Sequence, residues 1–340
     1  MQTVCLHQDL PFVRFVFSTD WHLTANPPGK RTGSYAAEIL EKIRFAGAVS
    51  KEKNAYSICG GDVFHQKNPK ASGNTFGLTN ELINTIRNDH NHGQIWGTHG
   101  NHDLTADRFE SIPDQPFGTI CAAKVYHDIS TVGSILFMSQ EDGLGINVQV
   151  DAWTYQTDDL KALKMVLSAA PRDPRAQYRV ALLHQYGDPG DQGSMFGHPT
   201  IGFNQMSDSD YDVALWGHDH SRTEPVTVGK CTHVRLGSLS RASLAEDEVD
   251  RPVNLALLGF RKEGVGFKEI PVPVKPLQIA FTAAAAPVEK VHKTEEVTAF
   301  FKEMDDAVSS ITSNDPWEIM RELSGADKKS YDLAVDLCGG

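Results

Sequence analysis

Short apolar runs recur along most of this chain, and turn residues bound each of them. The first run occupies residues 11–18 (PFVRFVFS), and similar runs occupy residues 54–59, 93–98, 178–183 and 211–216. Runs of this length that are rich in Val, Ile, Leu and Phe predict buried strands rather than helices. We therefore expect a core that is built largely from strands.

Helical patterning separates several of these strands. Apolar residues recur at intervals of three and four over residues 34–51, 73–89 and 157–169, which predicts helices with one buried face. Strand, helix, strand, helix, strand is the order of a layered α/β fold. Consecutive strands without helices are predicted at residues 124–126, 131–138, 146–152, 224–229, 231–236, 253–260 and 265–270.

The pattern changes near the C-terminus. Residues 271–288 are rich in Pro and Ala, as is typical of a linker, and residues 289–340 have helical patterning. One helix has a clear start, with Asp315 as N-cap and Pro316 at the first helical position. We predict a main domain at residues 1–270, a linker, and a small C-terminal helical appendage that either packs on the core or binds a partner.

Residue types that bind metals follow directly after the predicted strands. Any one such motif is usually an acid in a turn beside a surface imidazole. Their repeated placement after separate strands predicts that the side chains meet at one edge of the fold. Three other histidines, His90, His92 and His99, are expected to be surface residues or neighbours of the site. The motifs are Asp20-Trp21-His22, Gly60-Gly61-Asp62-Val63-Phe64-His65, Gly100-Asn101-His102-Asp103, His184 and Gly217-His218-Asp219-His220.

These side chains suit the chemistry of phosphodiester cleavage. Carboxylate, amide and imidazole groups form a mixed oxygen and nitrogen ligand set, which suits Mn, Fe or Zn better than Ca. Two such cations about 3.5–4 Å apart lower the pKa of a bridging water and neutralise the charge that develops on the phosphate. A cation pair needs a bridging carboxylate, and Asp62 is the carboxylate placed for that role.

Composition narrows the class of protein. The chain has 340 residues, of which 40% are hydrophobic and 22% charged, as in a soluble globular protein. A formal net charge of -12 argues against a broad basic surface that coats nucleic acid, but not against a nuclease with bound metals and a local basic rim. The five scattered cysteines form no CxxC pair and favour a reducing compartment.

Targeting and loop signals are few. The first residues lack a signal-peptide pattern, and no apolar run of about 18 residues occurs, so we expect a cytoplasmic protein with no membrane span, in the host cytoplasm if the chain is viral. The glycine-rich stretch at residues 187–199 lacks the GK[ST] sequence of a P-loop and is interpreted as a plain loop or a lid over a substrate.

The motifs, in their order, resemble those of the calcineurin-like metallophosphoesterase superfamily. The patterns DxH, GDxxH, GNHD, a lone His and GHxH span about residues 12–240. Within the superfamily, residues 61–65 with Pro69 resemble the double-strand-break repair nucleases of the SbcD type, which include bacteriophage recombination nucleases. The chain lacks the GDxVDRG and GNHE sequences of phosphoprotein phosphatases.

The resemblance implies a β-sandwich core flanked by helices and a centre that holds two divalent metal ions. Manganese is the expected ion, with Fe, Zn or Mg as alternatives. The implied ligands of one metal are Asp20, His22, Asp62 and His220, and those of the other are Asp62, Asn101, His184 and His218. His102 is then expected to stabilise the transition state or protonate the leaving oxygen, with Asp103 orienting it and His65 near the scissile phosphate.

The leading hypothesis is a manganese-dependent DNA exonuclease or endonuclease of repair or recombination. The resemblance implies a coiled-coil ATPase of the SbcC type as a partner of the C-terminal helices, and a homodimer is a further expectation. The alternatives are a small-molecule phosphodiesterase or phosphatase and, less favoured, a scaffold subunit without catalysis. Basic residues in or near the motif loops, which contact DNA or are solvated surface, are Lys30, Arg31, Lys67, Lys70, Arg108, Arg222 and Arg241.

Overall fold

The computed structural model describes most of the first of two units into which the chain divides, Met1–Pro287. The described residues are 2–5, 10–67, 73–106, 108–140, 145–169, 171–190, 200–243 and 251–281. The helical appendage predicted at residues 289–340 lies outside the described residues.

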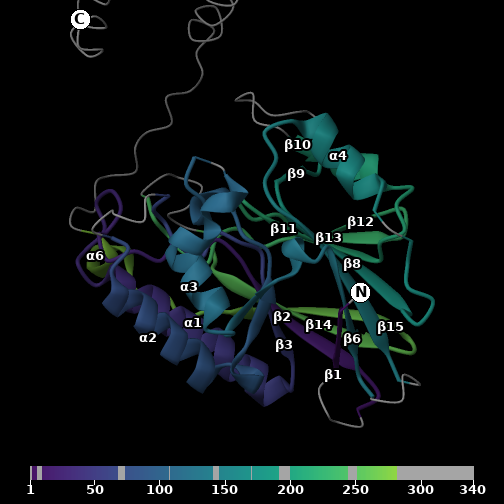
Figure 1. Cartoon of the computed structure of the whole chain (residues 1–340), viewed down its shortest axis with the longest axis horizontal. Helices are drawn as coiled ribbons and strands as arrows, with labels where there is room; N and C mark the ends of the chain where they lie inside the picture. The colour runs from purple at the N-terminus through teal and green to yellow at the C-terminus, as the bar shows by residue number, and fades with distance from the viewer. Residues whose placement is uncertain are drawn as a thin grey trace, which may run out of the picture. The chain divides into compact units, whose positions relative to one another are not determined.

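One sheet has six strands in the order β15-β14-β2-β3-β4-β5 (Figure 1). Its strands β2, β3, β4 and β5 are parallel, β14 pairs antiparallel with β2, and β15 pairs antiparallel with β14. The carboxyl ends of the parallel strands therefore lie at one edge. The bounds are β2 Val13–Ser18, β3 Tyr56–Cys59, β4 Ile95–Gly97, β5 Tyr126–Asp128, β14 Asn254–Arg261 and β15 Gly264–Pro271.

The other large sheet has seven strands in the order β1-β6-β7-β8-β11-β13-β12. Its central strands β7, β8, β11 and β13 are parallel. The bounds are β1 Gln2–Cys5, β6 Ser134–Met138, β7 Asn147–Trp153, β8 Tyr178–His184, β11 Val213–Gly217, β12 Val226–Val228 and β13 Cys231–Arg235. A separate pair, β9 Tyr186–Asp188 and β10 Thr200–Gly202, is parallel.

The two sheets pack face to face over an apolar core. Phe15 of β2 is fully buried, and its ring contacts those of Tyr56, Phe137 and Phe260 at centroid distances of 6.1, 5.1 and 5.1 Å. Phe137 belongs to the seven-stranded sheet, and the other rings belong to the six-stranded one. Offset and edge-on aromatic contacts of this kind stabilise a core beyond the area that they bury.

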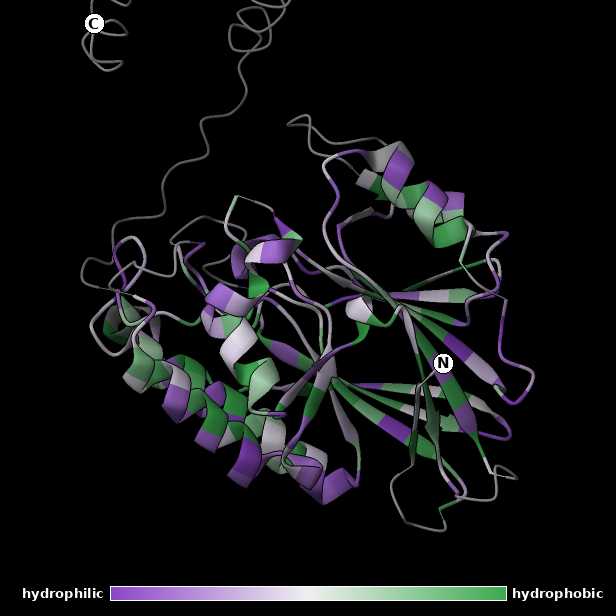
Figure 2. Cartoon of the chain, in the orientation of Figure 1, coloured by the Kyte–Doolittle hydropathy of each residue, from purple (hydrophilic) through white to green (hydrophobic). Residues whose placement is uncertain are grey.

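Helices form the outer layers. Apolar residues of α1 and α2 pack in one cluster with the outer face of the six-stranded sheet, and Figure 2 shows hydrophobic and hydrophilic positions alternating along these helices. On the seven-stranded sheet, α4 and β10 take part in a second cluster. The helices are α1 Tyr35–Lys53, α2 Phe76–Asp89, α3 Pro116–Ala122, α4 Asp159–Leu167 and α6 Leu277–Ala280, with short 3-10 turns η1 Asn91–Gly93, η2 Asn101–Asp103, η3 Phe109–Asp114, η4 Ile129–Thr131 and η5 Phe203–Met206.

The predicted fold class is confirmed: a layered α/β fold with a β-sandwich core between helices. Each strand and helix predicted within the described residues exists, with bounds that differ by a few residues. The short elements β1, α3, β9, β10 and α6 were not predicted, because each is too short to show a period in its sequence. Among the described helices, none is long and apolar enough to cross a lipid bilayer.

The start of the predicted linker is packed against the folded domain. β15 extends to Pro271, and both Val272 and Phe281 are buried. The backbone of Phe281 pairs with that of Arg31 in an isolated bridge. The domain boundaries stay predictions, since residues 282–288 lie outside the described part of the chain.

The core between the sheets can be tested with Phe15→Ala. Truncation of a buried Phe removes burial and leaves a cavity, so we expect a loss of about 3–5 kcal/mol in the free energy of unfolding, measured by urea denaturation. Phe76→Ala is the matched control, because that ring is 90% exposed and its loss is expected to cost less than about 0.5 kcal/mol. Equal destabilisation by both variants would show that Phe15 is not a core residue.

Candidate metal centre

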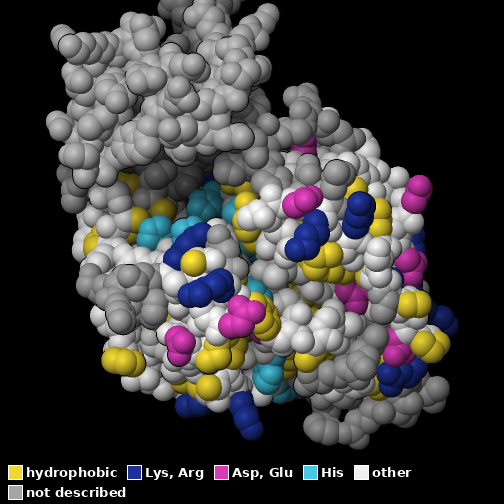
Figure 3. Space-filling model, turned by 45° about the horizontal axis from the view of Figure 1, so that its top comes forward, with side chains coloured by type: hydrophobic (Ala, Val, Ile, Leu, Met, Phe, Trp, Pro, Cys, Tyr) yellow, Lys and Arg dark blue, Asp and Glu magenta, His cyan; other side chains and the backbone are white. Residues whose placement is uncertain are grey.

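The predicted ligands converge from both sheets. Asp20 and His22 follow β2, Asp62 follows β3 and Asn101 follows β4, all in the six-stranded sheet. The seven-stranded sheet contributes the other ligands after β8 and β11: His184, His218 and His220. Figure 3 shows histidine side chains gathered in a hollow of the surface, with Lys and Arg side chains close by.

Several of these residues have left-handed backbone conformations. The φ angles are +53° at Asp20, +47° at His22, +50° at Asp62 and +78° at His218. A non-glycine residue in this region costs on the order of 1–3 kcal/mol, and such residues cluster at functional sites. The conformations direct each chain sharply out of its strand, so that the side chain points back over the strand ends.

Gly61 is required for the close approach of three loops. Its φ is +101°, and a Cβ there would lie 2.6 Å from the Nδ1 atom of His184 and 2.9 Å from the backbone nitrogen of Gly100. The backbone N–H groups of Asp20 and His22 donate to the carbonyl oxygens of Gly61 and Asp62, both at 3.0 Å. The two acid-bearing loops are therefore tied to each other by their backbones.

The ligand atoms form two groups that Asp62 joins. Asp20, His22 and His220 have ligand atoms within 4.8 Å of one another, and so have Asp62, His184 and His218. The Oδ2 atom of Asp62 lies 3.6 Å from the Nε2 atom of His22 and 3.4 Å from the Nε2 atom of His184. One carboxylate oxygen thus faces both groups.

The remaining contacts complete the two groups. The Nε2 atoms of His22 and His220 face each other at 2.8 Å. In the second group, the Oδ1 atom of Asn101 lies 3.4 Å from the Nε2 atom of His184. The structure thus brings together all the predicted ligands, and His22 also has a ligand atom within 4.8 Å of those of His65 and His102.

A hydrogen bond to a backbone carbonyl determines which ring nitrogen of His184 faces the other ligands. Its Nδ1 atom lies 2.7 Å from the carbonyl oxygen of Gly60, which can only accept, so Nδ1–H donates. The other ring nitrogen, Nε2, therefore faces Asp62. A carbonyl partner of this kind commonly fixes the tautomer of a histidine that binds a metal.

The electrostatics of the site fit divalent cations. Burial, together with the neighbouring imidazoles, lowers the pKa of His218 to about 2 and that of His22 well below its usual value, so both rings are neutral at neutral pH. Burial would raise the pKa of Asp62, but the charge of His184 outweighs it and holds that pKa well below the usual range. Within the described part of the chain, the ion pairs of Asp20 and Asp62 are with histidines rather than with Lys or Arg.

The imidazole and carboxylate groups of the site show whether it suits metal ions. Neutral imidazoles and buried carboxylates that pair with histidines are the ligands that Mn, Fe and Zn take. Burial lowers the pKa of His184, but Asp62 outweighs it and raises that pKa to about 9, so a cation there must displace a proton. The residues therefore fit two divalent ions. The ligand types do not distinguish among Mn, Fe and Zn.

His102 and His65 lie beside the first group of ligands. The ring of His102 is 4.9 Å from that of His22 and 5.7 Å from that of His65, measured between centroids. The Nδ1–H of His102 donates to the carbonyl oxygen of His65 at 2.6 Å, which leaves Nε2 as the reactive nitrogen. The backbone N–H of His102 donates to Oδ1 of Asp62 at 2.8 Å.

Asp103 acts on the backbone rather than on the ring of His102. This buried carboxylate accepts hydrogen bonds from the N–H groups of Val63, Phe64 and Gly100 at 3.2, 3.0 and 3.0 Å. It therefore joins the loops after β3 and β4, and it orients His102 only through the chain. Burial, with the nearby charge of Asp62, raises the pKa of Asp103 to about 7.

The basic residues proposed for DNA contact differ in their surroundings. Lys30 and Arg108 are exposed, and Lys67 is half-buried. Arg222 lies on the surface in ion pairs with Glu269 and Glu224 at 2.8 and 2.7 Å.

Arg31 and Arg241 are buried, and the structure gives both a role inside the domain. Arg31 forms a 2.5 Å ion pair with Glu38 and lies over the rings of Tyr35 and Phe281. Arg241 donates to the carbonyl oxygen of Lys275. Neither guanidinium is presented to solvent, whereas Lys70 lies outside the described residues.

The three histidines expected at the surface or beside the site differ from one another. His92 is exposed, but His90 and His99 are fully buried. His90 bonds to the hydroxyl of Ser57 at 2.8 Å, and the Nδ1 atom of His99 lies 2.7 Å from Asp128. Of the two expected positions, the surface one is excluded for these two histidines, because each imidazole has a polar partner inside the domain.

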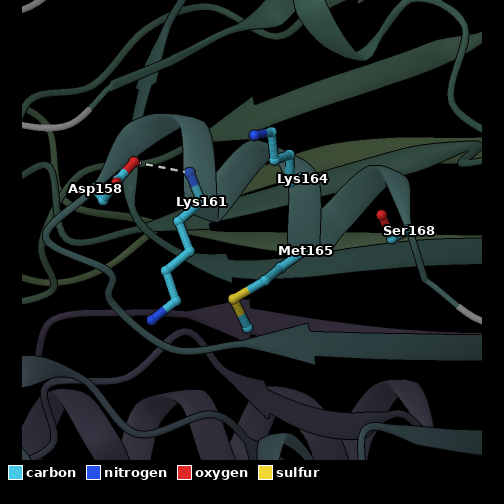
Figure 4. Close-up of a pocket in the computed structure, with 5 residues that line it drawn as sticks. All are labelled: Asp158, Lys161, Lys164, Met165 and Ser168. Carbon is cyan, nitrogen blue, oxygen red and sulfur yellow. Dashed lines mark hydrogen bonds between the residues drawn. The ribbon is translucent and has the colours of Figure 1, made fainter.

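A separate hollow of about 540 Å³ lies along α4 and holds none of the predicted ligands. In Figure 4 the side chain of Asp158 caps the helix by accepting from the backbone N–H of Lys161 at 2.8 Å. The hollow is lined by Asp158, Lys161, Lys164, Met165 and Ser168.

Comparison with known proteins identifies the family of the chain. Residues 13–222 match the family of calcineurin-like phosphoesterases, and the chain belongs to that family. The family uses divalent metals, and the two groups of ligands described above are the candidates for holding them. No curated protein sequence is detectably similar to this chain.

Similar solved structures are distant. The inner-membrane-complex anchor GAP50 of Plasmodium has 12% identity and a TM-score of 0.45, over 77% of this chain and 85% of that one. A 5'-nucleotidase precursor from Thermus thermophilus has 14% identity and a TM-score of 0.42, over 89% of this chain and 61% of that one. A putative diadenosine tetraphosphatase has 13% identity and a TM-score of 0.34, over 81% and 99%.

The shared carboxylate can be tested with Asp62→Asn. An amide carries no charge to offset the repulsion of two cations, so we expect metal content after Mn supplementation and desalting to fall from about two ions per chain to fewer than one. Elemental analysis measures it. Glu41→Gln, which removes an equivalent charge from the exposed face of α1, is the matched control and should keep both ions. Two tightly held ions in the Asp62 variant would exclude a bridging role.

Proposed function

We propose that this protein is a two-metal phosphodiester hydrolase that cleaves DNA, as an exonuclease or endonuclease of repair or recombination. The observation that carries the proposal is the position of Asp62, whose Oδ2 atom faces histidines of both ligand groups within 3.6 Å. Two cations in these groups supply Lewis acidity at the phosphate and lower the pKa of a bound water. The family membership supports a metal-dependent phosphoester hydrolase, and the DNA substrate is the further step.

The residues around the metals have separate tasks in this proposal. Asp20, His22, Asp62 and His220 would hold one cation, and Asp62, Asn101, His184 and His218 would hold the other. Asp103 fixes the loops that carry Asp62 and His102, through its three backbone contacts. His102 presents Nε2 to the phosphate. In its doubly protonated form, with Nδ1–H still donating to His65, the proton on Nε2 stabilises the developing charge or passes to the leaving oxygen.

A DNA substrate is supported by the form of the second motif. The run from Gly61 to His65, with Pro69 after it, resembles the SbcD-type nucleases, and His65 lies next to His102, as that resemblance implies. Lys30 and Arg108 are exposed in the loops that follow the first and third motifs, and they are the candidates for a local basic rim, which suits a phosphate backbone even on an acidic protein. Manganese is the proposed ion. The C-terminal residues 289–340 are proposed to bind an ATPase of the SbcC type, in the cytoplasm.

The role of His102 can be tested with His102→Asn. The amide can still donate to the carbonyl oxygen of His65, but it has no counterpart of Nε2. We expect both metals to remain bound and the turnover number on a phosphodiester to fall by about 10²- to 10⁴-fold, the usual contribution of a general acid. Steady-state kinetics with bis-p-nitrophenyl phosphate and Mn measures it.

His92→Asn is the matched control for that substitution. His92 is exposed, and Asn tolerates its left-handed backbone at φ +58°. Turnover should be unchanged in this variant. If His102→Asn turned over at the wild-type rate, His102 would have no part in the chemistry.

The substrate class can be tested with purified protein and Mn on linear duplex DNA, single-stranded DNA and bis-p-nitrophenyl phosphate. We expect cleavage of DNA and of the small diester, and loss of both activities in Asp62→Asn, because one centre serves both. Gel analysis of end-labelled DNA measures the first and absorbance the second. Cleavage of the small diester with all DNA intact would replace the nuclease with a small-molecule phosphodiesterase.

A further inference from the structure

Two tyrosines pack against the ring of His218, on the side of the metal centre that carries the second group of ligands. The ring centroid of Tyr155 lies 4.4 Å from that of His218 at an interplanar angle of 36°. Tyr186 meets the same ring edge-on at 4.3 Å. Both tyrosines are half-buried, so part of each ring faces solvent. We call Tyr155 and Tyr186 the tyrosine pair.

The tyrosine pair comes from two loops that one buried side chain holds together. Tyr155 follows β7, and Tyr186 begins β9 just after β8. The Gln185 side chain accepts from the backbone N–H of Gln156 at 3.0 Å and donates to the carbonyl oxygen of Gln156 at 3.2 Å. Gln185 is 2% exposed, and its amide forms one donated and one accepted hydrogen bond with the loop backbone, as a neighbouring strand would. The two rings are therefore set in place before any ligand binds.

The two groups of ligands have different neighbouring side chains. His65 and His102 lie beside His22, in the first group, with proton-carrying nitrogens. The tyrosine pair lies beside His218, in the second group, with aromatic surface.

We infer that the tyrosine pair binds the nucleobase next to the scissile phosphate. With the leaving oxygen towards His102, the nucleoside on the other side of the phosphate lies towards Tyr155 and Tyr186. Base-on-aromatic stacking tolerates any sequence, because every base has a π face, and it contributes about 1–3 kcal/mol per base. The inference rests on the proposed function and deepens it: the bound base must be unpaired, so the site accepts single-stranded or frayed DNA.

A single abasic residue in an otherwise uniform single strand of oligothymidylate tests the inference. The strand gives two rates in one reaction: cleavage at the phosphates that flank the abasic residue, and cleavage at the distant phosphates. We expect the wild-type protein with Mn to cleave one flanking phosphate roughly 5- to 150-fold more slowly than the distant ones, which is the fold-change equivalent of stacking one base. The ratio is independent of how active a preparation is.

Variants then assign the discrimination to the tyrosine pair. In the double variant Tyr155→Ala with Tyr186→Ala, the two rates should become equal within about threefold, because no ring remains to stack. The double variant Tyr155→Phe with Tyr186→Phe keeps both π faces and should keep the wild-type ratio. Equal rates in the wild-type protein, or a ratio that survives in the alanine variant, would overturn the inference.

A binding measurement separates this inference from the proposed function. If no DNA is cleaved, the nuclease proposal fails, and the tyrosine pair is judged by the fluorescence of 2-aminopurine deoxyriboside 5′-monophosphate added with Mn. Quenching that is lost in the alanine variant and kept in the phenylalanine variant supports base stacking. Quenching that is equal in all three proteins, or absent from the wild-type protein, overturns it.

Discussion

The candidate metal centre depends on one carboxylate, that of Asp62, which contacts histidines from both sheets. Asp62 comes from the six-stranded sheet, yet its Oδ2 atom lies 3.4 Å from His184 of the seven-stranded one. Every other feature of the site serves this contact: the left-handed turns at the strand ends, the absence of a side chain at Gly61, and the three backbone amides that Asp103 holds. Ligands from the two sheets can contact each other because the parallel strands of the sandwich end at one edge.

The ligands were predictable because each follows its own strand in the sequence, even though the ligands are far apart along the chain. Each follows a short apolar run, so the strand and its ligand appear together in the sequence, as at Ser18 to Asp20 and at Cys59 to Asp62. A run of Val and Phe is a strong signal for a buried strand, and the recurrence of metal-binding residue types after several such runs distinguishes them from ordinary turn residues.

Features that depend on packing between elements could not be predicted in this way. The burial of Arg31 depends on Glu38 and on the ring of Phe281, which is far along the chain. His99 is inside the domain because Asp128, at the end of β5, lies beside it. The tyrosine pair had no motif, although Tyr186 stands two residues after a predicted ligand at a strand end, which is a signal that a search of the strand ends would include.

The span of chain between the ligands has a consequence for biosynthesis. His22 and His220 are 198 residues apart, and their Nε2 atoms lie 2.8 Å from each other. During translation the N-terminal strands leave the ribosome long before β11, and contacts with such long loops form late. A half-made chain therefore contains four of the proposed ligands, Asp20, His22, Asp62 and Asn101, but no complete centre. Any hydrolytic activity is withheld from the nascent polypeptide until the second sheet has been synthesised and has closed over the first.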